Sequence, residues 1–431
     1  MQKFYFAFLF ISLLVSSCIT QKASVNQNDV SRIIKTLSSD KMEGRGLFSP
    51  GIDKAADFIA GEFKAIGLKP LAGATDFRQV FELTTLSPVS CLAYVNDKVV
   101  DPKDVFVITG KQSLNWQKNS GIEIQHIKAG ESFTVRYKAI LQLHKPVFVY
   151  VDPSFFDAFK RFREYYSAER IIDKVSEDEA VFVLGNETDV QSFTVNFGTK
   201  IEKQSFTNIV GVLPGKSKAK ELVVFSGHYD HLGIIDAVEG DSIANGADDD
   251  ASGITAVISL AKHYKKLNAN ERTLVFVAFT AEEIGGKGSQ YFSKQLNPDD
   301  VVAMFNIEMI GKESKFGKNS AFITGFDKSD FGAILQRNLN GTEFKFHPDP
   351  YPAEQLFYRS DNATLAALGV PAHTISTDQI DIDKYYHTVN DELSTLDIAN
   401  ITATIKAIAL SSRSIVDGRD TPKRIPPVSS K

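Results

Sequence analysis

The pattern of apolar and polar positions divides the chain into stretches of different periodicity. Near the N-terminus, apolar residues recur every three to four positions, which is typical of amphipathic helices. The first such stretch begins at about Asp29, and the second covers about residues 52–66 and stops at Gly67. We expect both helices to pack one apolar face against the rest of the protein.

Residues 85–204 have a different pattern, in which short β-branched and aromatic runs follow one another. The runs expected to be strands are 105–109, 122–127, 133–137, 147–151, 181–184 and 193–197. One helix, at about 154–175, interrupts them, and the histidines at 126 and 144 are isolated. We predict an inserted β-rich module that shapes substrate access without supplying catalytic groups.

From residue 205 apolar strands alternate with amphipathic helices, which is typical of an α/β domain. We predict an α/β fold with a mixed central sheet flanked by helices. Residues 30–84 contribute its N-terminal helical part and residues 205–417 its core. Residues 418–431 contain prolines and serines and are expected to be a flexible tail.

Composition agrees with a globular protein and excludes one class of partner. The chain has 431 residues, of which 43% are hydrophobic, so one large or two modest domains are expected. Its net charge of -5 gives no basic surface for nucleic acid.

Residues 1–17 have the pattern of an export signal. Lys3 precedes a short apolar run that is too short to span a bilayer. The sequence Leu-Val-Ser-Ser before Cys18 resembles a bacterial lipobox, in which the cysteine becomes the lipidated N-terminus. We expect an exported lipoprotein held to a bacterial membrane through Cys18, with residues 18–29 as a tether, facing the periplasm or the cell surface. An ordinary signal peptide with an incidental Cys18 is the alternative.

A cluster of imidazole and carboxylate side chains follows the strand expected at 222–225. His228, Asp230 and His231 lie within four residues, and three consecutive aspartates, 248–250, come in the next loop. Such ligands, gathered after the carboxyl end of a strand, suit a metal site in an open α/β sheet. The alternative is a solvated loop whose last aspartate caps the following helix.

Further polar signals lie after the later strands. Adjacent Glu282 and Glu283 can divide metal binding and proton transfer between them. Glu308 lies in an apolar run, where a lone carboxylate is costly unless it is paired or coordinated. Taken singly, each signal is more typical of a surface or structural residue. Together they give a ligand set that suits zinc, with two ions about 3.5–4 Å apart if one aspartate bridges them: His228, Asp249, Glu283, Glu308 and His387.

These segments resemble the successive motifs of the M28 family of zinc peptidases, in the family's order and over roughly residues 205–417. The motifs are GHYDHLG, NGADDDASG, FTAEEIGGKGS, FNIEMIG and YYHTVNDELSTLD. The segment SSDKMEGRGLFSP also resembles the part that precedes the insertion in bacterial members. The resemblance implies a zinc exopeptidase fold.

The resemblance also implies two Zn²⁺ per chain and a role for each candidate residue. Asp249 would bridge the two ions. His228 and Glu308 would complete the ligands of one ion, and His387 and Glu283 would complete those of the other. Further residues would act on these ligands or on the substrate: Glu282 as general base, Asp230 as the group that orients His228, and Tyr386 as the group that polarises the scissile carbonyl.

Three features depart from the family pattern. Glu308 stands where many members have aspartate, and Asn362, beside Asp361, stands where bacterial relatives often have histidine. The insertion lies where many relatives carry a protease-associated domain, whose glycine-rich pattern is not found here.

The prediction is therefore an aminopeptidase that hydrolyses N-terminal residues from peptides, with a hydroxide shared by two zinc ions. The alternatives are a glutaminyl cyclase-like acyltransferase with one zinc, a carboxypeptidase, and a non-catalytic binding protein on the same scaffold.

Overall fold

The computed structural model describes residues 25–172, 175–186 and 190–428. The expected signal peptide and Cys18 lie outside this part of the chain. The described residues form two compact units. Within the described ranges, unit 1 combines residues 25–77, 210–278 and 295–428, and unit 2 combines residues 78–209 and 279–294. No helix in the described ranges has both the length and the hydropathy needed to cross a membrane.

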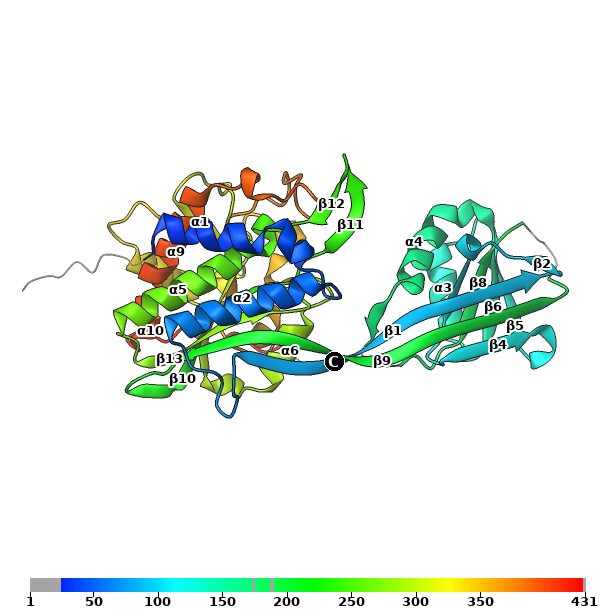
Figure 1. Ribbon diagram of the computed structural model, residues 1–431, viewed down its shortest axis with the longest axis horizontal. Coiled ribbons are helices and arrows are strands. Elements are labelled where there is room, and N and C mark those ends of the chain that lie inside the picture. Colours follow the sequence, from blue (N-terminus) through cyan, green and yellow to red (C-terminus); the bar gives the residue numbers. More distant parts are fainter. Residues whose placement is uncertain (1–24, 173–174, 187–189, 429–431) are drawn as a thin grey trace, which may run out of the picture. The chain divides into compact units, whose positions relative to one another are not determined.

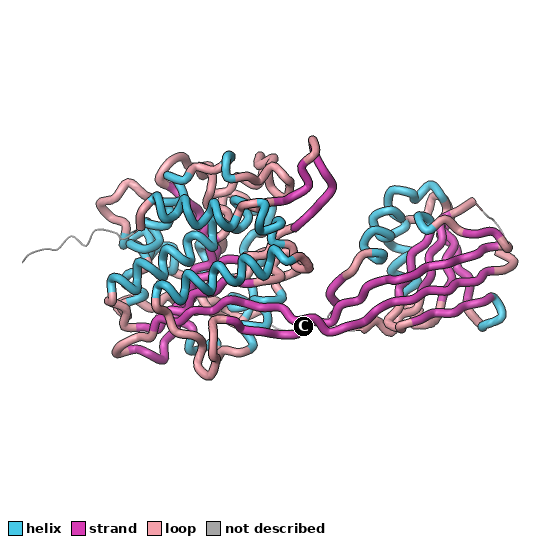
Figure 2. Tube along the Cα trace, viewed as in Figure 1, coloured by secondary structure: helices cyan, strands magenta, loops and turns pink. Residues whose placement is uncertain are grey.

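Unit 1 is built around a mixed β-sheet (Figures 1 and 2). Its strands lie in the order β16 (Lys345–Pro348), β15 (Ser320–Ile323), β17 (Ala372–Ser376), β14 (Val301–Ile307), β10 (Lys218–His228) and β13 (Arg272–Phe279). Strand β14 is parallel to β10 and β17, whereas β15 is antiparallel to β17. Every residue of β13, β14 and β17 is buried, which explains their continuous apolar runs. The predicted mixed sheet is confirmed.

A layer of helices covers one face of this sheet (Figure 1). It consists of α1 (Gln27–Leu37), α2 (Pro50–Ile66), α5 (Gly253–Leu267) and α9 (Ile398–Ser411). Helix α5 contacts both β10 and β14. The side chain of Asn26 caps α1, which therefore begins inside the segment expected to be a tether. Helix α2 follows Ser49 and ends at Gly67 in the left-handed conformation, as a C-terminal glycine favours.

The remaining helices of unit 1 are short. They are α7 (Phe331–Asn338), α8 (Asn362–Ala367) and α10 (Arg413–Val416). Helix α8 packs on β14 and β17, and α7 packs on α9.

The segment after α10 is packed along unit 1, where the sequence analysis expected a flexible tail. Ile425 is buried, and its amide donates to the main-chain oxygen of Gly369 at 3.0 Å. The amide of Val428 donates to Ala367, also at 3.0 Å. Buried Arg272 donates to the main-chain oxygen of Asp420 at 2.6 Å. These partners lie far away in the sequence. The prediction of a flexible tail used only the proline and serine content of the segment, which does not record such contacts.

The strands of unit 2 form two groups. In one, the long strands β1 (Arg78–Val95) and β9 (Phe193–Leu213) pair antiparallel and are extended by β2 (Lys98–Val99), β4 (Ser113–Gln117) and β7 (Arg170–Ile172). In the other, the order is β3 (Val105–Ile108), β8 (Ala180–Leu184), β6 (Val147–Val151) and β5 (Glu123–Ile127). Helices α3 (Phe133–Leu141) and α4 (Phe156–Ser167) pack on the second sheet, and α6 (Lys287–Lys294) also belongs to unit 2.

The four-stranded sheet of unit 2 is buried on both faces. Val105 and Val107 contribute to the core shared with β1, β4 and β9, whereas Phe106 and Ile108 contribute to the core beneath α3 and α4. Residues 133–137, expected to be a strand, are instead the start of α3. The expected helix at 154–175 is also shorter, because α4 ends at Ser167 and β7 follows. Apolar side chains in α3 recur at helical spacing toward the same core, a period that a five-residue window is too short to show.

Candidate active site

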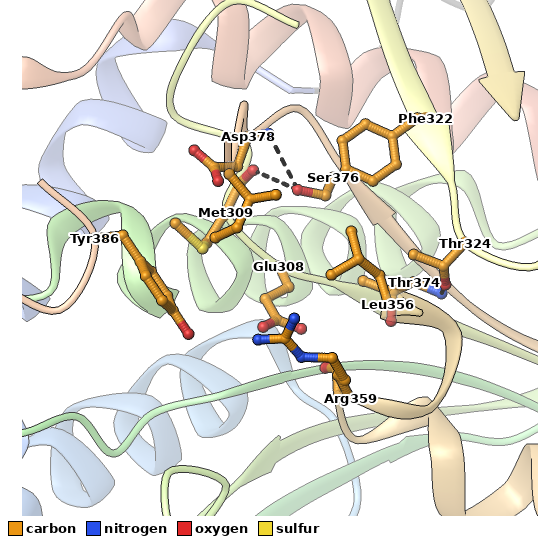
Figure 3. Close-up of a pocket in the computed structure, with 12 residues that line it drawn as sticks. Glu308, Met309, Phe322, Thr324, Leu356, Arg359, Thr374, Ser376, Asp378 and Tyr386 are labelled. Atoms are coloured by element: carbon orange, nitrogen blue, oxygen red, sulfur yellow. Dashed lines mark hydrogen bonds between the residues drawn. The ribbon is translucent and has the colours of Figure 1, made fainter. Parts of the chain in front are cut away.

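Parallel strands of unit 1 end at a common edge of the sheet, and a polar side chain stands at each end. His228 is the last residue of β10, Glu308 directly follows β14, and Asp378 comes two residues after β17. Carboxyl ends of parallel strands share one edge, so side chains far apart in the sequence come together there. Figure 3 shows Glu308 and Asp378 around the same pocket.

Asp249 is buried, and its two carboxylate oxygens face different imidazoles. Oδ1 lies 3.1 Å from Nε2 of His228, and Oδ2 lies 3.2 Å from Nε2 of His387. Nδ1 of His231 is 3.8 Å from Oδ2. Burial disfavours the charge of this carboxyl, but hydrogen bonds from His228 and His387 bring the pKa of Asp249 well below its usual range. The structure thus brings two predicted histidine ligands, His228 and His387, to the carboxylate of a third predicted ligand, Asp249.

Asp250 turns toward the backbone instead. Its carboxylate accepts hydrogen bonds from the amides of His228 at 3.1 Å, Gly253 at 3.0 Å and Met309 at 3.2 Å. Burial raises the pKa of Asp250 well above its usual range. Only glycine fits at position 253, because a Cβ there would lie 2.1 Å from the main-chain oxygen of Ile307. Asp250 therefore joins the end of β10, the start of α5 and the segment after β14.

Asp248 also serves the local structure. Its carboxylate accepts a hydrogen bond from the amide of Gly311 at 2.7 Å and pairs with Nζ of Lys312 at 3.3 Å. Its main-chain oxygen accepts from Oγ of Ser252 at 2.8 Å. Burial raises the pKa of Asp248. Of the three consecutive aspartates, the middle one is the residue whose oxygens face the imidazoles.

The ring of His228 contacts Asp230 mainly through the main chain of that residue. Nδ1 of His228 is 3.1 Å from the main-chain oxygen of Asp230 and 3.9 Å from its carboxylate Oδ1. This contact directs Nε2 toward Asp249.

A buried arginine that the sequence analysis assigned no role holds the loops of the site together. Arg45 is fully buried, and its guanidinium donates only to main-chain oxygens, those of Leu37, Tyr229, Asn245, Gly246 and Asp249. Burial lowers the pKa of Arg45, and the charge of Asp249 opposes this shift more than that of any other carboxylate. Arg45 lies in the segment MEGRG, but the acceptors in the two loops are 184 to 204 residues away in the sequence.

Tyr386 stacks on His387, with ring centroids 3.9 Å apart. Figure 3 shows its hydroxyl end directed toward the carboxylate of Glu308. Asp361 is buried in the same unit. Its neighbour Asn362 has a structural role, because Nδ2 donates to the main-chain oxygen of Phe357 at 2.8 Å and Oδ1 accepts from Thr374 at 2.9 Å.

The two adjacent glutamates lie in a turn that follows β13. Ala281 has a positive φ of 59°, and the main-chain oxygen of Glu282 accepts from the amides of Gly285 at 2.8 Å and Gly286 at 3.0 Å. Both glutamates are half-buried. The division of roles between Glu282 and Glu283 stays a prediction.

A pocket in unit 1 extends from Glu308 and Tyr386 (Figure 3). Apolar side chains make up much of its wall: Met309, Phe322, Leu356 and Ile380. Hydroxyl groups of Thr324, Thr374 and Ser376 add polar points, and Arg359 and Asp378 also line it.

Residues 208–411 match the model of peptidase family M28. This segment of the chain belongs to that family. Among curated proteins, a probable zinc metalloprotease of Pyrenophora tritici-repentis is 29% identical over 129 residues, which are 29% of this chain and 26% of that protein. Aminopeptidase YwaD of Bacillus subtilis is 23% identical over 207 residues, covering 44% of this chain and 40% of that protein. The chain thus matches less than half the length of either M28-like relative.

Solved structures are similar in fold over most of this chain. A zinc aminopeptidase from Bacillus subtilis has a TM-score of 0.59 at 15% identity, covering 93% of this chain and 98% of that one. An aminopeptidase from Aneurinibacillus sp. strain AM-1 has a TM-score of 0.56 at 19% identity, covering 94% and 96%. The predicted family and its fold are confirmed.

Proposed function

We propose that this M28 protein is a zinc-dependent aminopeptidase that binds two Zn²⁺ and removes N-terminal residues from peptides. The observation that carries the proposal is Asp249, whose two carboxylate oxygens each face the Nε2 of a different histidine. A carboxylate shared between two imidazole-bearing sites is the arrangement that a pair of bridged ions requires. The similarity to a probable zinc metalloprotease and to the fold of a zinc aminopeptidase supports the choice of metal.

The donor set fits zinc. Imidazole and carboxylate are the ligands that Zn²⁺ accepts alongside thiolate. In the described part of the chain, the ion pairs of the Asp249 carboxylate are with His228, His231 and His387. In this proposal Asp249 would be shared by the two ions, His228 and Glu308 would hold one of them, and His387 and Glu283 would hold the other.

When bound, the two ions would polarise the scissile carbonyl and lower the pKa of the attacking water. The other steps fall to the chain's own side chains. Glu282 takes the proton of the water and returns it to the leaving amine. Tyr386, stacked on His387, directs its hydroxyl to the carbonyl oxygen. Asp230 keeps His228 oriented through its main-chain oxygen at 3.1 Å from Nδ1.

The pocket beside Glu308 would receive the side chain of the N-terminal residue. Met309, Phe322, Leu356 and Ile380 offer it apolar contacts. Burial of apolar surface contributes about 25 cal/mol per Å², so residues such as leucine or phenylalanine should be preferred to glycine. Comparing kcat/KM for leucine, phenylalanine and glycine p-nitroanilides measures this preference.

The experiment that tests the proposed function uses one peptide in three forms, with both termini free, with an acetylated N-terminus, or with an amidated C-terminus. We expect cleavage from the N-terminus of the first and third forms and none of the second. Trimming from the other end would show a carboxypeptidase. Loss of ammonia from an N-terminal glutamine peptide, with one zinc per chain, would show a glutaminyl cyclase. Peptide binding without turnover would show a binding protein.

We also propose that the chain is exported and held to a membrane by acyl groups on Cys18, because residues 1–18 resemble a lipoprotein signal. Changing Cys18→Ser should abolish labelling of the protein by a radioactive fatty acid and release it from the membrane fraction. A wild-type protein that takes up no label would contradict the anchor without affecting the peptidase proposal.

A further inference from the structure

The loop of residues 378–391 in unit 1 carries both Tyr386 and His387. His387 has a backbone φ of 57°, a left-handed conformation that a residue other than glycine keeps only where its surroundings impose it. Its side chain is 36% exposed, whereas that of His228 is 1% exposed. Burial therefore fixes His387 much less than it fixes the first histidine, and the loop itself must be held in place.

One anchor lies after His387. Asp391 is fully buried, and its carboxylate accepts hydrogen bonds from the amides of Asp248 and Asp249, each at 3.0 Å. Its main-chain oxygen accepts from the amide of Ala247, also at 3.0 Å. The end of the loop is thus attached to the backbone of the bridging aspartate.

A second anchor lies before His387. Nζ of Lys312 makes a close ion pair with Asp383 and is 3.3 Å from Oδ2 of Asp248. The lysine side chain is only 17% exposed. The main-chain oxygen of Lys312 accepts from Oγ1 of Thr377 at 2.6 Å and from Nδ2 of Asn400 at 2.7 Å, so its own backbone is fixed. The two anchors flank His387, and both end on Asp248, the neighbour of Asp249.

Lys312 places a positive charge beside a group of three aspartates. Carboxylate oxygens of Asp248, Asp378 and Asp383 lie within 4.8 Å of one another. Such a group would repel itself in a partly buried position, but the ammonium of Lys312 pairs with two of its members. Removing one partner of a buried ion pair leaves an uncompensated charge and is strongly destabilising. Without Lys312, the segment before His387 should move away from Asp248.

We propose that Lys312 is a positioning residue for the second metal site, holding His387 at its distance from Asp249. The inference rests on the proposed two-zinc function and adds a residue that contacts no expected metal ligand directly. Groups that orient metal ligands from behind typically change metal affinity by about 10–100-fold when they are mutated. The loss should fall on the ion bound by His387 and leave the ion bound by His228.

The chain supplies a matched control. Lys315 pairs with Asp381 at 3.2 Å, joining the same two segments as Lys312 and Asp383, but both side chains are about half exposed, at 43% and 46%. Exposed pairs of this kind contribute little. We expect Lys315→Met to bind two zinc ions with wild-type affinity. Lys312→Met should weaken one of the two by about 10–100-fold, and Lys312→Arg should recover part of this loss.

The test is a zinc titration against a chromogenic chelator, repeated in a His387→Ala background. If Lys312 acts through His387, Lys312→Met costs one ion's affinity in the wild type and nothing further in His387→Ala. The cobalt-substituted protein should lose the absorption of one site only. Asp383→Asn removes the same anchor from the loop side, and it should reproduce the loss if Lys312→Met does not fold.

A wild-type protein that binds two zinc ions, with both Lys312→Met and Asp383→Asn keeping them at unchanged affinity, would overturn the role of Lys312. An equal loss in Lys315→Met, or a further loss in the His387→Ala background, would also overturn it, because the effect would then be general. A wild type that binds no zinc would instead overturn the proposed function itself.

Discussion

The two units bury their strands in the same way but use the strand ends differently. In unit 2, β6 is buried throughout and is followed by Asp152, whose carboxylate only caps a surface turn by accepting from the amide of Ser154 at 2.9 Å. In unit 1, β10 is buried toward its end and finishes at His228, which is 1% exposed and faces a buried carboxylate. An apolar run therefore indicates a core in both units. Burial of the polar group at the end of the run is what distinguishes the candidate active site, because such burial is costly unless the group is paired or coordinated.

The largest effect is expected at the bridging carboxylate. Asp249→Asn replaces a charged ligand by a neutral one in both metal sites, so both ions should bind weakly and activity should fall by more than about 10³-fold. Zinc content and kcat measured together check this result. Asp236→Asn, on the exposed hairpin strand β11 (Gly233–Val238), is the control and should behave as wild type. Full activity in Asp249→Asn would show that unit 1 does not house the metal site.

The next effect separates the adjacent glutamates. Glu282→Gln should lower kcat by about 10²–10⁴-fold, the usual cost of losing a general base, while both zinc ions stay bound. Glu283→Gln should lose or loosen one ion, because an amide oxygen is a weaker ligand than a carboxylate. If the first variant loses zinc and the second retains it, the two roles are the reverse of those proposed.

A core substitution in the inserted residues 85–204 tests whether this part of the chain is separate from the chemistry. Phe148 is fully buried and stacks on Phe193 at 4.3 Å between ring centroids, so Phe148→Ala should cost about 3–5 kcal/mol of stability. The chain's single tryptophan, Trp116, belongs to the same core and reports unfolding by its fluorescence. Phe156→Ala removes an exposed phenylalanine of unit 2 and is the control.

Under conditions where unit 2 of the Phe148→Ala variant remains folded, zinc content and kcat on a leucine p-nitroanilide should match the wild type. Loss of zinc from this variant would contradict the separation between scaffold and site.

The last effect is on stability rather than activity and concerns Asp378, which lines the pocket. Burial raises the pKa of Asp378 to about 8 in the folded protein, against a usual value of 3.8. The folded state therefore holds the proton more tightly, and this stabilising contribution is lost as pH rises from about 4 to about 8. Asp378→Asn cannot ionise, so its stability relative to wild type should increase over that range.

Urea unfolding of the metal-free proteins at pH 5 and pH 8 measures the difference. Asp381→Asn, at an exposed position in the same loop, should show no comparable change. A constant difference between Asp378→Asn and wild type at both values would contradict the raised pKa.

Local periodicity predicted much of unit 1 because its strands and helices are long and regular. Helix α5 (Gly253–Leu267) and strand β14 (Val301–Ile307) belong to the alternation of helices and strands that the sequence predicts after residue 205. Prediction was poorer in unit 2. Strand β1 was not predicted, because its buried and exposed residues alternate irregularly. Helix α3 was predicted as a strand, because the spacing of its apolar residues was judged over only five residues.

In the candidate site, the residues expected to bind metal were predicted, whereas the residues that hold them in place were not. Composition could not separate three consecutive aspartates, and only the resemblance to the family's motif selected Asp249. Arg45, Lys312 and Asp391 were missed because each acts on groups distant in the sequence. Arg45 and its acceptor in Asn245 are 200 residues apart, and Asp391 lies 143 residues from Asp248. No local pattern records such a contact, so the residues that hold a site are harder to predict than the residues that form it.

The central claim is that Asp249 bridges two ions, and anomalous X-ray scattering at the zinc absorption edge tests it most directly. Crystals of the zinc-loaded protein should give two peaks about 3.5–4 Å apart. One peak should lie beside Oδ1 of Asp249 and His228, and the other beside Oδ2 of Asp249 and His387. A single peak in fully active protein, or two peaks that do not share Asp249, would contradict the account.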